Sequence, residues 1–492
     1  MSDRGRQPVL VGVAAVSQRE ADVERALEPS GLMARALEAA AADAGGPAWL
    51  ERIDRIAVPR GFWDYSDPGR LVAETVGAAG ARTALAEIGV LQTSLFARAC
   101  RALQAGEAEV VAVVGGEAKH REKEAKRVGS EAPLSAQCGA EPDETWRPAA
   151  DILHPVELSQ HLGMPVRQYA VIENALRSAE GKSLLAHREE VARLWAAMSE
   201  VAVENPDAWS RKPVAAEVIR DPGPENPMLA FPYGRLHTSQ WNVDQAAALL
   251  FTTEAVARAA GVPEAQWIRP RAVVESNHML PLVERAELHR CPAFGIAACR
   301  ALGLADLALE DVSLLELYSC FPSAVRVQQR ELGLPLDGAR PPSLTGGMAF
   351  AGGPLNNFVL QAAVRMARKL RESPGANGLL TAVSGMLTKQ GLSLWSTLAG
   401  PDFAAEDVGE QAQRQTGTVE VEAGFSGTAR IEGYTVLYDR SGPTHTVLLA
   451  RTGAGRRAVV AATGAALADA AVSRELTGLE VEIAPGEARL AG

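Results

Sequence analysis

Short apolar runs alternate with alanine-rich segments of helical periodicity along most of the chain. Apolar runs predict strands, and segments of helical periodicity predict helices. In the first part of the chain the predicted strands are residues 8–13, 53–58 and 109–117, and the predicted helices between them are residues 30–43 and 94–105. The same alternation returns later, with predicted strands at residues 272–275, 312–317 and 378–383 and predicted helices at 293–302 and 357–370. Strands that alternate with helices are typical of layered α/β proteins. The pattern therefore predicts two related α/β halves.

Two regions depart from this pattern. Residues 118–239 are polar and contain several prolines, with a helix expected at 188–203, and insertions of this length often cover a site or contact a partner. In the tail, apolar and polar residues alternate, which predicts a small, closed, OB-like β-barrel. The predicted domains are 1–117 with about 240–268 for the N-terminal half, 118–239 for the insertion, 269–405 for the C-terminal half and 415–492 for the β domain.

Composition and charge narrow the possible fold classes, functions and cellular locations. The 492 residues are 47% hydrophobic but only 5% aromatic, which favours helices packed tightly on a sheet over an all-β chain. A formal net charge of −11 argues against a nucleic-acid-binding surface as the main function. No apolar run approaches the roughly 20 residues that a membrane span needs, and the N-terminal residues lack a signal-peptide core. These features predict a cytoplasmic protein.

The cysteines predict neither a disulfide framework nor a structural metal. They form an odd set without a CxxC pair or a zinc-type spacing to histidine: Cys100, Cys138, Cys291, Cys299 and Cys320. Cys100 and Cys299 lie in alanine-rich helical patterns, where a small buried thiol is expected. Cys320 alone lies in a segment that predicts a site.

That segment is residues 315–322, where polar and reactive side chains follow an apolar strand. Tyr318, Ser319 and Cys320 come directly after the predicted strand, and a helix is expected to begin near Ser323. Turns from a strand to a helix form active sites in layered α/β proteins. The three side chains are therefore candidate catalytic residues, although a buried hydrogen-bonded tyrosine and a packed thiol are the structural alternatives.

Four segments resemble motifs of the thiolase superfamily, in particular of thiolase-like proteins with an extra C-terminal β domain. Residues 106–117 are similar to the passage after the thiolase nucleophile, 317–321 to the HDCF or NEAF motif, 346–354 to the glycine-rich GHP motif and 377–385 to the last motif. The resemblance covers nearly the whole chain. It implies a duplicated, layered αβαβα fold in the acyltransferase (acetyl-CoA acetyltransferase) family, with a role in lipid metabolism. A coenzyme A thioester would be its substrate or ligand, and no cofactor would be permanently bound. A homodimer is the family expectation, with a monomer or hetero-complex as alternatives.

The departures from the thiolase motifs concern the reacting groups. A thiolase uses one thiolate to accept the acyl group, a second cysteine to move a proton, and histidine with asparagine or histidine for activation. The segment 88–95, where the nucleophile should fall, has no cysteine. By the resemblance, Gly353 stands at the histidine position, Tyr318 at the asparagine or histidine position and Ala382 at the second cysteine. Ordinary thiolase chemistry is therefore not expected.

Two classes of function remain open. In the first, Tyr318 is the acid/base group of a retro-aldol cleavage of β-hydroxyacyl-CoA, assisted by Ser319, Cys320, His237 or His278. A phenol has a reference pKa of about 10 and would need nearby cations to act as a base. In the second, catalysis is lost and the fold binds an acyl-CoA, a lipid or a partner protein. His237 is expected in a polar loop before a helix starting at 242–245, and His278 either lines a cavity or lies on an exposed loop.

Candidate residues for binding the substrate or coenzyme A follow the same motifs. They are Gln92, Thr93, Ser94, Gly352, Gly353, Ser384, Gly385 and Lys389. The first three lie near the start of the helix after the nucleophile position, where backbone N–H groups can bind an oxyanion; capping by Thr93 or Ser94 is the structural alternative. Lys389 is either a contact for phosphates or thioester or an ordinary surface lysine. No residue is predicted to bind a metal.

Overall fold

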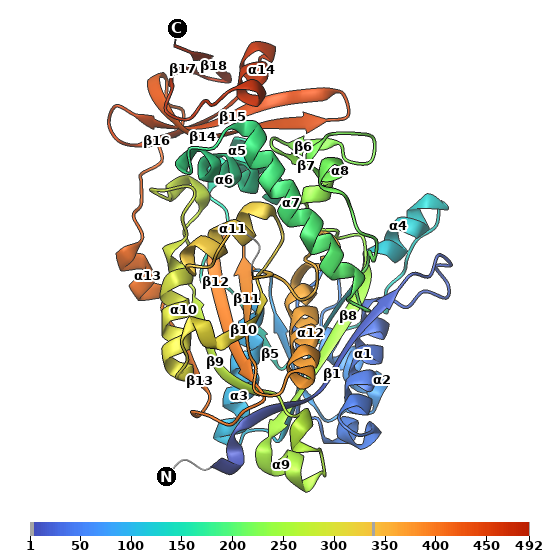
Figure 1. Ribbon diagram of the computed structural model, residues 1–492. Coiled ribbons are helices and arrows are strands. Elements are labelled where there is room, and N and C mark those ends of the chain that lie inside the picture. Colours follow the sequence, from blue (N-terminus) through green and yellow to red (C-terminus); the bar gives the residue numbers. More distant parts are fainter. Residues whose placement is uncertain (1–3, 337–339, 492) are drawn as a thin grey trace.

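The computed structural model describes residues 4–336 and 340–491, whose strands form three sheets (Figure 1). The first sheet has the order β1-β8-β4-β2-β3-β5. Its strands are β1 (Pro8–Gln18), β2 (Arg55–Pro59), β3 (Arg82–Ala86), β4 (Val110–Ala118), β5 (Glu144–Trp146) and β8 (Asp244–Thr253). β5 belongs to the predicted insertion and pairs in parallel with β3, so the insertion covers the outer edge of this sheet.

The second sheet has the order β10-β11-β12-β9-β13. Its strands are β9 (Arg269–Ser276), β10 (Val312–Glu316), β11 (Asn377–Ser384), β12 (Lys389–Ser396) and β13 (Ala404–Asp407). β10 and β11 are parallel, whereas β12 is antiparallel to both of its neighbours. The two sheets therefore contain the repeated elements that the hydrophobic pattern predicts.

Helices arrange these two sheets in five layers. α1 (Pro29–Asp43) and α2 (Pro68–Val76) cover the outer face of the first sheet, and α10 (Pro292–Ala305) with α13 (Gly409–Gln415) covers the second. α3 (Gln92–Ala105) and α12 (Phe358–Glu372) lie between the sheets and contact strands of both. The layered αβαβα architecture is thus confirmed. Both central helices begin near residues that the sequence assigns to the site.

One element differs from its sequence-based expectation. A helix was expected to begin at 242–245, but residues Asp244–Thr253 form β8, antiparallel to both β1 and β4. Every residue of β8 is buried. A strand buried on both faces lacks the alternation of apolar and polar residues that marks a half-exposed strand, so an apolar run of this length does not reveal its own type.

The insertion contains helices separated by long loops. Its helices are α4 (Lys119–Arg127), α5 (Pro155–Ser159), α6 (Pro165–Ala179), α7 (Leu184–Val203) and α8 (Ala216–Arg220), and α9 (Glu254–Ala259) follows β8. α7 includes the helix expected at 188–203. α11 (Pro322–Glu331) begins at the turn after β10 and packs against α6 and α7. The insertion therefore lies directly against the predicted site turn.

The third sheet contains the C-terminal β domain and two strands of the insertion. Its elements are β6 (Met228–Ala230), β7 (Tyr233–Gly234), β14 (Gly427–Asp439), β15 (Gly442–Thr452), β16 (Arg457–Ala462), β17 (Glu480–Ala484) and β18 (Glu487–Leu490), with α14 (Ala465–Ser473) beside them. α6 packs against β14, and the Asn174 amide donates to the carbonyls of Phe231 and Tyr434, both at 3.0 Å. In Figure 1 this domain lies at one end of the molecule, next to α5, α6 and α7.

The predicted β domain is confirmed, but a closed barrel is not shown. Its main hydrogen-bonded order runs from β16 through β15, β14 and β17 to β18. No backbone pairing between β16 and β18 closes that order in the described part of the chain. The sequence pattern identifies the antiparallel strands, whereas closure depends on whether the two end strands meet, which alternation does not specify.

Two further observations concern single side chains and membrane spans. Cys299 is exposed on α10, so the expectation of a buried thiol is wrong at this position, whereas Cys100 is buried. An alanine-rich helix has few polar residues to mark its exposed face, which makes the orientation of a single thiol hard to predict. Over residues 4–336 and 340–491, no helix is both long and apolar enough to cross a membrane.

Candidate functional site

The turn after β10 presents Tyr318 beside the start of α12. Its ring meets Phe358 edge-on, with the ring centroids 6.0 Å apart, and its backbone N–H donates to the Thr381 hydroxyl at 2.7 Å. The phenol hydroxyl makes no hydrogen bond to the described residues. Burial raises the pKa of Tyr318 above its ordinary value, and the nearby Cys320 raises it further. Tyr318 is therefore protonated at neutral pH and is not prepared to act as a base.

Ser319 and Cys320 connect this turn to neighbouring loops. Ser319 is fully buried, and its Oγ accepts from the backbone N–H of Met348 at 3.2 Å. Burial raises the pKa of the Cys320 thiol to about 12, although the side chain of Tyr169 partly opposes the shift. A protonated thiol is a weak nucleophile. In this arrangement Ser319 supports the glycine-rich loop, and Cys320 packs in the core.

His237 lies in a short buried turn, at a position where the sequence predicts a polar loop. The side chain is 4% exposed, and its Nδ1 accepts from the backbone N–H of Gly234 at 3.2 Å. Its ring stacks on Tyr233, with centroids 5.5 Å apart. Burial lowers the pKa of His237 to about 4, so the imidazole is neutral at physiological pH. The aromatic neighbours that bury it come from strands that a local pattern does not reveal.

Packed neighbours fill the space around Gly89, in the segment where the resemblance places the nucleophile, and around Gly353, which the resemblance aligns with the thiolase histidine. Gly89 has φ of 102°, and a Cβ placed on it would lie 2.8 Å from Cγ of Pro148. A Cβ on Gly353 would lie 3.0 Å from Cβ of Ser239 and 3.3 Å from Cε of Met348. Real Cβ atoms rarely approach their neighbours so closely. Neither position leaves room for a cysteine or histidine without movement of these neighbours.

The start of α3 is occupied by a carboxylate from the second sheet. Thr93 Oγ1 donates to Oε1 of Glu275 at 2.5 Å, and Ser94 Oγ lies 2.9 and 2.7 Å from Oε1 and Oε2. Capping by Thr93 or Ser94 is wrong, because the N-cap is Leu91 and no side chain caps the helix. Gln92 instead donates to Oδ1 of Asn356 at 2.8 Å and so links α3 to the segment before α12.

Lys389 lies close to the same cluster and is not a surface lysine. It is 3% exposed, and its Nζ donates to Oδ1 of Asn277 at 3.1 Å; the Asn277 amide in turn donates to Asp407 at 2.7 Å. Burial lowers the pKa of Lys389, opposed by the charges of Glu275 and Asp407. Burial also raises the pKa of Glu275, opposed by Thr93, Ser94 and Lys389.

A wide cleft of about 850 Å³ opens at this cluster, and Ser94, Glu275, Asn277 and Lys389 are in its wall. Its basic residues are Arg55, Arg82, Arg98, Arg101, Arg147 and Lys389, and its acidic ones are Glu107, Glu144, Glu275, Glu406 and Asp407. Arg55 pairs with Glu107 at 3.0 Å and Arg82 with Glu144 at 3.6 Å. Within the described part of the chain Arg98 and Arg147 form no ion pair, and the Arg98 guanidinium lies 4.4 Å from the Trp146 ring centroid. The volume is in the range of small-molecule sites.

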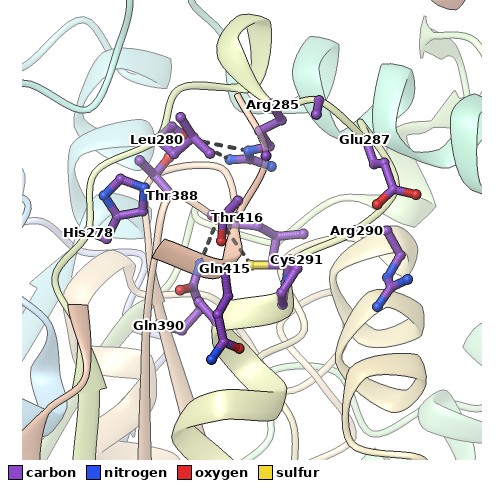
Figure 2. A pocket seen from close by; sticks show the side chains of 15 residues that line it. His278, Leu280, Arg285, Glu287, Arg290, Cys291, Thr388, Gln390, Gln415 and Thr416 are labelled. Atoms are coloured by element: carbon purple, nitrogen blue, oxygen red, sulfur yellow. Dashed lines mark hydrogen bonds between the residues drawn. The ribbon is translucent and has the colours of Figure 1, made fainter. Parts of the chain in front are cut away.

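The remaining predicted residues lie elsewhere. His278 lines a separate pocket together with Arg285 and Cys291 (Figure 2). Gly352, at φ 104°, packs against Gln245, and Gly385 accepts from the Tyr169 hydroxyl at 3.3 Å. Ser384 is buried at the end of β11. Thus Ser94 and Lys389 come together in the cleft with Glu275, whereas Tyr318 and His278 do not join them.

Two charged residues that line these pockets, Glu275 and Arg285, are not among the candidates predicted from the sequence. Glu275 is the second-last residue of β9 and is 8% exposed, and Arg285 is 4% exposed in the loop that follows. A charged residue near the end of an apolar strand indicates a candidate site residue, because buried charges need a partner or a function. By this criterion Glu275 could have been predicted from the sequence. No group of three or more metal-ligating side chains able to hold an ion occurs among residues 4–336 and 340–491.

Comparison with known proteins identifies a matching family for one region and solved structures with a similar architecture. Residues 407–488 match the family described as thiolase-like protein type 1 additional C-terminal domain. A monomeric SCP2-thiolase-like protein type 1 from Mycobacterium smegmatis is 28% identical, with a TM-score of 0.84 over 100% of both chains. A search of curated proteins gave no match.

Two other solved structures share the fold at lower identity. The Ltp2–ChsH2(DUF35) aldolase is 18% identical, with a TM-score of 0.59 over 80% of this chain and 99% of the other. The human mitochondrial 3-ketoacyl-CoA thiolase in complex with CoA is 18% identical, with a TM-score of 0.56 over 80% and 99%. Together with the family match at residues 407–488 and the 28% identical thiolase-like protein, these structures show a thiolase-superfamily fold with an additional C-terminal domain.

Proposed function

We propose that the protein binds an acyl-CoA thioester in the cleft at the start of α3 and does not catalyse thiolysis. The observation that carries this proposal is the cleft itself, which brings Ser94 and Lys389 together under a rim with several arginines. Ligands of this class combine a phosphate-rich end with a thioester, so they need cations at the entrance and polar donors deeper inside.

Arg98 and Arg147 are the residues best suited to the phosphates. Both are exposed, and neither is committed to an ion pair with the described residues. A guanidinium presents a planar set of donors that matches phosphate oxygens. Lys389 and Ser94 would then lie on the side of the thioester. Glu275 already accepts the hydroxyls of Thr93 and Ser94, and its negative charge disfavours an oxyanion at the same helix start.

The thiols support the absence of thiolysis. Burial raises the pKa of Cys320 to about 12, that of Cys291 to about 12 and that of Cys100 above its ordinary value. A thiolate is the nucleophile that a thiolase needs, and none of these groups supplies one at neutral pH. Gly89, in the segment expected to hold the thiolase cysteine, and Gly353, at the expected histidine position, are enclosed by neighbouring side chains.

The retro-aldolase alternative rests on Tyr318 and has weaker support. A catalytic phenol at neutral pH needs a cation or donors that stabilise its phenolate. The influences on Tyr318 are burial and Cys320, and both raise its pKa. The aldolase with the related structure is only 18% identical and indicates a shared fold, not a shared reaction.

Isothermal titration calorimetry with acetyl-CoA tests the proposal. The wild-type protein should bind, and Arg98→Glu and Arg147→Glu should each weaken binding by about tenfold, equivalent to about 1.4 kcal/mol. Arg430→Glu is the matched control, because Arg430 is also exposed but lies on β14 of the C-terminal domain. Acetoacetyl-CoA with free coenzyme A should give no acetyl-CoA. Absence of acetyl-CoA binding, equal binding by all three variants, or thiolysis at enzymatic rates would each refute the proposal.

A further inference from the structure

A second pocket, of about 90 Å³, lies on the other side of the strand that carries Lys389 and shares no lining residue with the cleft. Its wall comes from the loop after β9, the start of α10, the turn between β11 and β12, and residues 415–417. Figure 2 shows Arg285, His278, Cys291 and Gln390 around this space. The pocket is therefore built by segments that are far apart in the sequence.

Arg285 is a buried cation that forms no ion pair with a carboxylate among residues 4–336 and 340–491. Its Nε and Nη2 each lie 3.2 Å from the carbonyl oxygen of Leu280, and Nη2 also donates to the carbonyl of Met386 at 2.6 Å. These acceptors are neutral. Nη1 is buried and has no hydrogen-bond partner in the described part of the chain. An unpaired charge in the interior is costly, so the free Nη1 indicates a site for an anionic group.

The acidic group that acts on Arg285 is already engaged elsewhere. Glu157 favours the charged guanidinium, but its carboxylate accepts from the backbone N–H groups of His154 at 2.9 Å and Val283 at 3.2 Å. Arg290, which also lines the pocket, pairs with Glu331 at 2.6 Å. Glu287 stands at the pocket wall with its side chain 60% exposed, where water screens its charge.

The rest of the wall combines two polar side chains with an apolar surface. His278 Nε2 and Gln390 Oε1 are buried and likewise lack partners among the described residues. Gln390 Nε2 and the Cys291 thiol both donate to the carbonyl of Leu387, at 2.7 and 3.6 Å. Apolar contacts come from Leu280, Ala286, Pro292, Ala293 and Leu387. One end of the pocket therefore suits an anion and the remainder suits a hydrocarbon chain.

We propose that this pocket binds a short-chain carboxylate, with its oxygens on Arg285 Nη1 and His278 and its carbon chain against Leu280 and Ala293. A carboxylate matches the geometry of a guanidinium, and a charge-assisted hydrogen bond in a buried site is stronger than a neutral one. The small volume, about 90 Å³, limits the ligand to a few carbon atoms. Inorganic anions would leave the apolar wall uncovered.

Thermal unfolding of the full chain without coenzyme A tests this site independently of the cleft. Sodium propionate should raise the melting temperature progressively with concentration at constant ionic strength, because a ligand that binds only the folded state stabilises it. Propionamide, which has the same size without the charge, and sodium chloride should give no such rise. Arg285→Gln should abolish the response to propionate.

A second variant keeps the test decisive if loss of Arg285 prevents folding. Ala293→Leu fills the pocket from α10 and leaves Arg285 in place, so it should also abolish the response. Cys299→Leu is the matched control, because Cys299 is exposed on the same helix and does not line the pocket. The proposal is overturned if propionate fails to stabilise the wild-type protein, if propionamide stabilises it equally, or if Ala293→Leu retains the full response.

Discussion

Replacement of Glu316 by glutamine should change how stability depends on pH. Glu316 ends β10, two residues before Tyr318, and is fully buried. Its carboxylate accepts from the backbone N–H groups of Leu344 at 2.6 Å and Thr345 at 2.8 Å, and from the hydroxyls of Ser343 and Thr345. It therefore holds the loop that leads into the glycine-rich segment. Burial raises the pKa of Glu316 to about 7, against the opposing effect of these donors.

The sign and size of the effect follow from this pKa. An acid whose pKa is higher in the folded than in the unfolded state contributes stability that is fully present below the unfolded value, here 4.5, and is lost as the pH rises through the folded value of about 7. At 1.36 kcal/mol per pKa unit, the loss is about 3 kcal/mol. Glutamine does not ionise, so Glu316→Gln should lack this loss. Between pH 4.5 and 8 the variant should gain about 3 kcal/mol relative to the wild-type protein.

Differential scanning calorimetry across this pH range measures the difference. For a chain of this length, about 3 kcal/mol corresponds to a relative change of about 3 °C in melting temperature. Glu310→Gln is the control, because Glu310 is exposed just before β10 and should leave the pH profile unchanged. Parallel profiles for wild type and Glu316→Gln would show that the donors cancel the effect of burial on the pKa, and a wild-type protein that gains stability relative to the variant as the pH rises would show that they outweigh it. Either result would refute the reasoning.

Two other consequences can be measured directly. Tyr233→Phe should lower the free energy of unfolding by about 2 kcal/mol in urea, because the Tyr233 hydroxyl lies 2.5 Å from the buried Glu173 carboxylate and 2.9 Å from Ser323 Oγ. Tyr438→Phe, at a half-buried tyrosine without a hydroxyl hydrogen bond to the described residues, should change it little, and an equal loss in both variants would contradict this account. Iodoacetamide at neutral pH should modify the exposed Cys138 and Cys299 before the buried Cys100, Cys291 and Cys320, as followed by mass spectrometry. Early modification of Cys320 would instead indicate a thiolate in the turn.

The insertion links the additional domain to the turn that contains Tyr318. Tyr233 follows β6, which pairs with β14 of the third sheet, and its hydroxyl lies 2.5 Å from Glu173 on α6. The same hydroxyl accepts from the backbone N–H of Ser323, at the start of α11. One buried phenol thus connects the third sheet, the insertion and the predicted site turn.

The sequence by itself determined the types of most elements, because apolar periodicity reflects which face of each segment is buried. It also determined what the chain lacks: a missing cysteine in 88–95 and a glycine at 353 are read directly from the residues. The strand β8 was not predicted, because burial on both faces removes the alternation of apolar and polar residues that identifies a strand. The site residues were predicted as separate positions along the chain, without their distances.

Only the tertiary structure decided which of those positions meet. Glu275 lies 181 residues from Ser94, and Met386 lies 101 residues from Arg285, yet both pairs are in hydrogen-bond contact. It also decided that Lys389 is buried and that His237 is neutral, because burial depends on neighbours from distant strands and helices. Protonation states and contacts are properties of an environment, and that environment exists only after distant segments have packed together.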